Sequence, residues 1–200
     1  MRALAIGVLC SWLCACAVLR PTPPVSPQAA AWNAHRAAMA AVDGYTLEGR
    51  VAIQRDSEGG SLKLRWQQQA GTTDLRLRAP LGQGGFQLRR DAGGVTLTAA
   101  DGQRYTASSF ESLMQTHLKW VFPVDGARYW VLGIPDPAAR VDHLELDAQG
   151  RLSDLAQSGW RISVLAYRET DGQSLPARLL LIAGKVQIRL VIDRWELKHA

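Results

Sequence analysis

The sequence predicts a mainly β domain: an incomplete antiparallel barrel of about eleven strands, with helices that cover an apolar cavity. Two observations lead to this fold class. Most of the chain after residue 44 consists of short segments in which apolar and polar residues alternate, which gives strands with one apolar and one wet face. Between residues 108 and 133 the spacing becomes that of amphipathic helices. A sheet this long should curl, with the helices inside the curve.

The chain begins with a short apolar stretch after a single arginine, as a secretory signal does. The stretch is too short to span a bilayer, which takes about 20 residues. Cys16 follows the small residue Ala15, with Leu13 three positions before it. The run resembles a bacterial lipobox, which implies that residues 1–15 are removed and that Cys16 carries an acyl anchor. The alternative is an ordinary secretory signal in which the cysteines are apolar filler.

Cysteine use and charge agree with export. All three cysteines lie in the first sixteen residues, so the rest of the chain has no internal disulfide and no thiolate metal site. The net charge is +5, which suits an anionic membrane surface, and export disfavours nucleic acid as a partner. We expect one domain, residues 32–200, that folds as a monomer around its own core.

A proline-rich tether should join the anchor to this domain. Four prolines fall within residues 21–27, and such a segment stays extended and solvated, so residues 16–31 are assigned to the tether. An Ala-rich helix over residues 28–42 overlaps the end of that range and stops at Asp43-Gly44. Ala17 follows Cys16 where an Asp would indicate retention in the inner membrane, so the lipobox resemblance implies the periplasmic face of the outer membrane.

The strands are expected in two groups, separated by the helical stretch. Turns are expected at Gly59-Gly60, Gly93-Gly94, Asp101-Gly102 and residues 148–150, with a tight hairpin at 182–185. The alternating segments are residues 45–54, 62–66, 75–78, 86–90, 95–99, 104–106, 143–147, 151–157, 160–167, 177–183 and 185–195.

The central stretch predicts two helices. Ser109 is a good N-cap for the first, which Pro123 would end, and a second should run over residues 125–132. The apolar face of the first helix comprises Phe110, Leu113, Met114, His117, Leu118 and Val121. Set against a curled sheet, this face would enclose an apolar cavity, although each side chain alone fits a core position equally well. The predicted acyl-cavity lining is Trp66, Phe110, Leu113, Met114, Trp130 and Trp160, with Trp120 and Tyr167 as further aromatic candidates.

Motifs for catalysis or metal binding are not found. The histidines form no HxH or HExxH pair, and there is no G-x-S-x-G elbow, so neither zinc chemistry nor a serine hydrolase is indicated. The glycines at 82–85 lack the spacing of a phosphate-binding loop and precede a strand. We expect no catalytic residue, no metal and no cofactor. A catalytic pair of carboxylates brought together by folding is left open as an alternative.

The same glycine-rich loop carries an unusual apolar residue. Pro80 and Gly82 flank Leu81 between two predicted strands, where a polar residue is usual. Leu81 either projects as a probe for a membrane or partner, or tucks back over the barrel mouth, and local sequence favours neither.

Short motifs along nearly the whole chain resemble the LolB family of outer-membrane lipoproteins. They are the lipobox at Cys16, Trp32, Gly49-Arg50, Trp66-Gln67-Gln68, Pro80-Leu81-Gly82, residues 102–107, residues 129–135, Gly159-Trp160, Leu175-Pro176-Ala177 and residues 192–195. The resemblance implies a half-barrel lidded by helices, and a protein that takes lipoproteins from a LolA-type periplasmic carrier and inserts them into the outer membrane. It implies that cargo acyl chains occupy the cavity and that Leu81 acts in membrane insertion. The loop departs from the family pattern in being richer in glycine.

Two other functions remain open from sequence. One is an outer-membrane lipoprotein enzyme that acts on glycan through paired Asp and Glu residues. The other is an assembly scaffold that binds proteins along the sheet edge, for which a filled core without a lipid-sized cavity would be expected.

Overall fold

A single antiparallel sheet of eleven strands forms the body of the molecule in the computed structural model, which describes residues 26–80, 84–118 and 120–198. The strand order is β6-β5-β4-β3-β2-β1-β11-β10-β9-β8-β7, so the sheet is two meanders joined where the first strand pairs with the last. The strands are β1 (Gly44–Arg55), β2 (Glu58–Gln69), β3 (Thr72–Arg78), β4 (Gly85–Asp91), β5 (Gly94–Ala99), β6 (Arg104–Ala107), β7 (Val141–Leu146), β8 (Leu152–Gln157), β9 (Trp160–Thr170), β10 (Gln173–Ala183) and β11 (Val186–Lys198).

The sheet is curled but not closed, because β6 and β7 form its two edges. This confirms the predicted fold class, including the number of strands. Alternation decides which side chains face inward: Leu47, Val51 and Ile53 of β1 point into the curve, while Glu48 and Arg50 point to solvent. The inward rows form one continuous apolar core.

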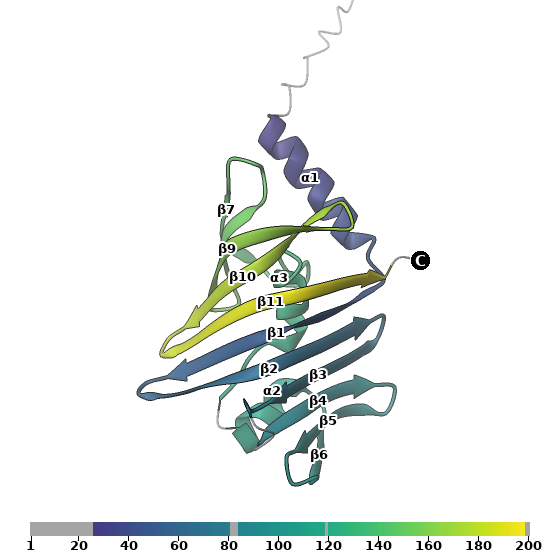
Figure 1. Cartoon of the computed structure of the whole chain (residues 1–200), viewed down its shortest axis with the longest axis vertical. Helices are drawn as coiled ribbons and strands as arrows, with labels where there is room; N and C mark the ends of the chain where they lie inside the picture. Colours follow the sequence, from purple (N-terminus) through teal and green to yellow (C-terminus); the bar gives the residue numbers. More distant parts are fainter. Residues whose placement is uncertain (1–25, 81–83, 119, 199–200) are drawn as a thin grey trace, which may run out of the picture.

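Two short helical segments cover the concave face, and in Figure 1 α2 and α3 lie behind the sheet. They are α2 (Phe110–Leu113), which continues as the π-helical turn η2 (Met114–Leu118), and α3 (Val124–Trp130). As predicted, the Ser109 side chain caps α2, by accepting a hydrogen bond from Ser112 N. Within the described residues, no helix is long and apolar enough to cross a membrane.

The helix α1 (Pro27–Ala40) lies at the end of the sheet where β1 begins (Figure 1). Its N-terminal turn rests on the β7–β8 connection, where Gln28 Nε2 donates to Asp147 O at 2.7 Å. Gly150 makes this seat possible: its φ is +76°, and a Cβ there would lie 2.5 Å from Gln28 O. Further along α1, His35 Nε2 lies 3.0 Å from Leu132 O.

Three local predictions were wrong. The helix expected after Ser109 is shortened to one α turn and one π turn. Leu118 of its predicted inward face still packs against the core, but His117 is exposed and Val121 is 36% exposed. Gly59 and Gly60 lie inside β2, and the turn falls at residues 56–57, where Asp56 adopts φ +52°. Because α1 begins at Pro27, residues 27–31 are helical and not part of an extended tether.

Candidate functional site

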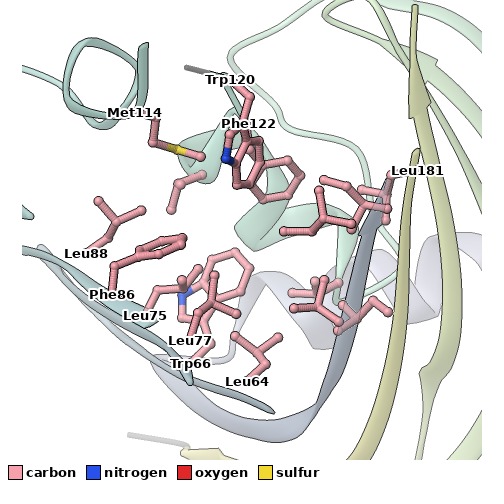
Figure 2. A pocket seen from close by; sticks show the side chains of 16 residues that line it. Leu64, Trp66, Leu75, Leu77, Phe86, Leu88, Met114, Trp120, Phe122 and Leu181 are labelled. Carbon is pink, nitrogen blue, oxygen red and sulfur yellow. The ribbon is translucent and has the colours of Figure 1, made fainter. Parts of the chain in front are cut away.

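An apolar cavity lies between the concave face of the sheet and the segment from η2 to α3 (Figure 2). Its walls come from β1 to β4, β10 and β11, and Met114, Trp120, Phe122 and Val124 close it from the other side. Every one of its sixteen lining residues is apolar: Val51, Ile53, Leu64, Trp66, Leu75, Leu77, Phe86, Leu88, Met114, Trp120, Phe122, Val124, Val131, Leu181, Ile188 and Leu190.

The mouth of the cavity is at one end of the sheet. Ile53, Phe86, Trp120 and Phe122 are the lining residues toward that end that stay partly exposed. Because neighbouring strands run antiparallel, successive connections alternate between the two ends of the sheet. The connections at this end are β1–β2, β3–β4 and β10–β11. The cavity therefore opens beside the loop that joins β3 to β4, while α1 occupies the opposite end.

The cavity is narrow. Its empty space is about 550 Å³ when the mouth is included, and most of that space is too narrow to admit a water molecule. An all-apolar space of this kind gives water no hydrogen-bond partner, so it suits hydrocarbon. Met114, Trp120 and Phe122 form the wall opposite the sheet. An acyl chain that enters would press chiefly on these side chains, of which Met114 is the most adaptable.

Trp66 forms the floor of the cavity and is itself supported by aromatic contacts. Tyr45 packs edge-on against Trp66 with ring centroids 6.0 Å apart, and against Trp195 at 5.4 Å. Burial raises the pKa of Tyr45 well above its ordinary value, so the hydroxyl stays neutral and donates to Arg128 O at 3.2 Å. Trp66 Nε1 is buried and has no hydrogen-bond partner in the described part of the chain, which costs about 1–3 kcal/mol.

The six predicted lining residues are all buried, but they divide into two groups. Trp66 and Met114 line the cavity, and Phe110, Leu113, Trp130 and Trp160 are not among its lining residues. One of the second group, Trp160, supports the wall from behind, and Phe110 contacts a cation of β4. Trp160 packs edge-on on Phe122 with centroids 5.5 Å apart, and the Arg90 guanidinium, paired with Asp125, lies 4.6 Å from the Phe110 ring centroid.

Sequence reasoning missed a buried polar residue that fixes the segment after α3. The Gln157 side chain, 0% exposed, uses its full hydrogen-bonding capacity. Its Oε1 accepts from Trp130 Nε1 at 2.8 Å and from Asp136 N at 2.9 Å. Its Nε2 donates to Asp136 O and Ala139 O, both at 2.9 Å. Gln157 closes an alternating strand and gave no local signal, because nothing in the sequence marks the carbonyls that it would meet.

The structure describes the two ends of the predicted insertion loop, and the predicted anchor lies outside the described residues. Pro80 is exposed, Ala79 N donates to Gly84 O at 3.1 Å, and Leu81, Gly82 and Cys16 lie outside the described residues. Gly85 must be glycine, since its φ is +129° and a Cβ would lie 2.2 Å from Leu77 O. The described residues contain no group of three or more His, Cys, Asp or Glu side chains placed to hold a metal ion.

Comparison with known proteins gives the chain a family. Residues 43–195 match the family described as "Outer membrane lipoprotein LolB". The chain belongs to the LolB family. The outer-membrane lipoprotein LolB of Stutzerimonas stutzeri is 37% identical over 198 residues, which cover 98% of this chain and 96% of that protein. LolB of Nitrosococcus oceani is 38% identical over 186 residues, 92% of each chain.

The similarity to LolB extends over the strands that build the cavity, since the family match runs from the start of β1 almost to the end of β11. This confirms the resemblance found in the sequence motifs and the outer-membrane location that it implied. Among solved structures, a protein domain from Vibrio parahaemolyticus has a TM-score of 0.53 and 10% identity, over 84% of this chain and 91% of that one. That similarity concerns the fold alone.

Proposed function

We propose that this protein receives lipoproteins from a LolA-type periplasmic carrier and inserts them into the inner leaflet of the outer membrane. Membership of the LolB family supports this function. The single observation that carries it is the cavity, whose sixteen lining residues are all apolar and whose mouth lies beside the β3–β4 loop. A cargo acyl chain would lie among Trp66, Met114 and the aromatic side chains of the mouth.

The energetics favour transfer between cavities over release into water. Burial of one methylene is worth about 0.8 kcal/mol, so a chain of ~16 carbons represents roughly 12 kcal/mol before other costs. No single polar contact offsets that amount, so the chain must stay covered throughout. When the chain passes from one apolar cavity to another, the free energy of burial lost in the first is nearly regained in the second. The bilayer is the final acceptor. The step makes and breaks no covalent bond, and we assign no catalytic residue and no cofactor.

The N-terminal segment would supply the membrane attachment. Acylation of Cys16 after removal of residues 1–15 would anchor the chain, and the proline-rich segment before Pro27 would space the body from the lipid surface. Replacement of Cys16 by Ala should give uncleaved precursor or soluble protein with an intact fold. Mass spectrometry that finds a mature chain with another first residue and no acyl mass would exclude this anchor. We propose a monomer, because the sheet curls over its own core.

Leu81 would act in delivery and not in receipt of cargo. One Leu in a membrane interface is worth at most about 1.5–3 kcal/mol, enough to orient the mouth toward the bilayer but not to anchor the protein. A two-stage assay with purified carrier–cargo complex tests this. Leu81→Glu should accept cargo normally and keep its melting temperature, while incorporation into liposomes falls by about tenfold or more. Equal incorporation by wild type and variant would refute the insertion role.

A further inference from the structure

A pair of unneutralised cations lies on the outside of the sheet, at the end where the cavity opens. Lys63 of β2 and Arg78 of β3 are directly opposite each other in the antiparallel register. Both side chains are exposed, and opposite positions place Cβ atoms only about 4.5–5.5 Å apart. Like charges at such positions repel and are destabilising, so the folded state alone gives no reason for the arrangement.

The neighbouring acids are already engaged. Arg65 pairs with Glu48, and Arg76 pairs with Asp74 at 2.8 Å. On the other flank Arg50, which is opposite Lys63 in β1, pairs with Asp193 at 3.0 Å. Neither Lys63 nor Arg78 has an acidic partner among the described residues, and loop residues 81–83 contain no carboxylate. Two positive charges therefore remain for an external anion.

The surface around the pair is shaped to admit one. Lys63, Arg65, Arg76 and Arg78 border an open hollow of about 860 Å³ that also reaches Gln67. In the next strand the residue opposite Arg78 is Gly85, which has no side chain to cover the guanidinium. A guanidinium can bind phosphate oxygens through two parallel hydrogen bonds, and an ammonium adds a point charge beside it.

The position of the pair relative to the cavity indicates the source of the anion. Leu77 lines the cavity, and Arg78, the next residue and the last of β3, lies on the opposite face of the same strand. The β3–β4 loop follows directly. If the mouth faces a bilayer, as the proposed function requires, Arg78 and Lys63 come to the level of the lipid headgroups.

We propose that Lys63 and Arg78 form a binding site for the phosphate groups of anionic membrane phospholipids, and that this contact orients the cavity mouth toward the membrane. The inference rests on the proposed function for its orientation. Each cation near an anionic surface contributes about fivefold in binding, so the pair contributes roughly thirtyfold.

Vesicle co-sedimentation of the mature chain, residues 16–200 with Cys16→Ala, tests the site without the anchor. The vesicles are phosphatidylcholine with or without about one-third phosphatidylglycerol. The parent chain should bind the anionic vesicles more tightly, and Lys63→Gln/Arg78→Gln should lose roughly thirtyfold of that affinity. The swap Lys63→Arg/Arg78→Lys keeps both charges and should retain binding. Because the pair repels itself, the double Gln variant should melt no earlier than the parent.

The matched control removes one Lys and one Arg elsewhere on the outer face. Arg178→Gln/Lys198→Gln lies on β10 and β11, with Lys198 at the α1 end of the sheet, and both side chains are exposed. It should lose less than about threefold. An equal loss in control and test variants would reduce the effect to net charge and overturn the site. Equal binding of the parent to both vesicle types would also overturn it, as would full competition by inorganic phosphate at matched ionic strength, which would indicate a free-ion site.

Cargo transfer separates this inference from the proposed function. The Lys63→Gln/Arg78→Gln variant should take cargo from the carrier at the parent rate, since neither side chain lines the cavity. Normal uptake with unchanged vesicle binding would refute the headgroup site alone. Failure of the parent itself to take up cargo would instead refute the receptor function.

Discussion

The two halves of the sheet follow the same alternation of residues, but one is filled and the other is hollow. Behind β8 and β9, the side chains of Leu152, Leu155 and Ile162 are 0% exposed, and none of them lines the cavity. On the concave side of β1 to β4, the inward-facing side chains line the cavity instead. The two halves differ in what faces them. Trp130 of α3 packs into the filled half, where its Nε1 donates to Gln157 of β8. The hollow half faces the short turn of η2, Trp120, Phe122 and Val124 at the start of α3.

The filled half supplies a rigid frame and the hollow half supplies the binding site. Gln157 ties the facing segment to β8 through four hydrogen bonds, so the frame is held by specific polar contacts as well as by packing. The wall of the hollow half has no such tie among its sixteen apolar residues. Substitutions in the filled half should therefore lower the stability of the protein, whereas substitutions in the hollow half should mainly change the binding of ligand.

The largest effect on stability is expected when the polar tie of the filled half is cut. Gln157→Leu removes four hydrogen bonds and leaves Trp130 Nε1, Asp136 N and Ala139 O without these partners, while Asp136 O keeps the bond from Ala139 N at 3.3 Å. We expect the free energy of unfolding to fall by about 2–4 kcal/mol, measured by urea denaturation. The exposed Gln54→Leu is the control and should change stability by less than about 0.5 kcal/mol. Equal effects of the two substitutions would mean that Gln157 is not a structural tie.

Enlargement of one leucine in each half tests the comparison itself. Leu155→Phe overfills a packed region and should cost about 1–3 kcal/mol, whereas Leu64→Phe can extend into the cavity and should cost less than about 1 kcal/mol. Thermal melts of both variants decide the matter. A larger loss for Leu64→Phe would show that the hollow half is as tightly packed as the filled one.

A smaller effect is expected at the α1 contact as pH falls. Burial lowers the pKa of His35 below its ordinary value of about 6.5, and the Arg151 charge lowers it further, while the contact with Leu132 O partly opposes this. The unfolded chain then takes up a proton before the folded chain does, so stability declines as pH drops below about 6.5. The melting temperature should fall between pH 7.5 and pH 5.5, and His35→Gln should reduce that fall. An identical pH response in both proteins would refute the assignment.

The strands and their inward faces could be predicted from sequence because alternation is a local signal. Val51, Trp66 and Leu77 follow directly from it. The division of the aromatic residues could not be predicted: Trp120 lines the cavity and Trp130 does not, which depends on how the chain turns after Met114. Nor could sequence show that Lys63 and Arg78 are opposite, because a shift of register by one residue would separate them. Leu81 and Cys16 remain predictions, since they lie outside the described residues.

The most direct test of the account is the binding of a fluorescent fatty acid to the purified protein and its displacement by a diacylated peptide. The account predicts saturable binding that the peptide displaces. Leu64→Phe, which narrows the cavity, should weaken that binding, and Gln54→Leu should leave it unchanged. Absence of displacement from the wild-type protein, or equal binding by Leu64→Phe and wild type, would contradict the claim that the hollow half holds the acyl chains of cargo.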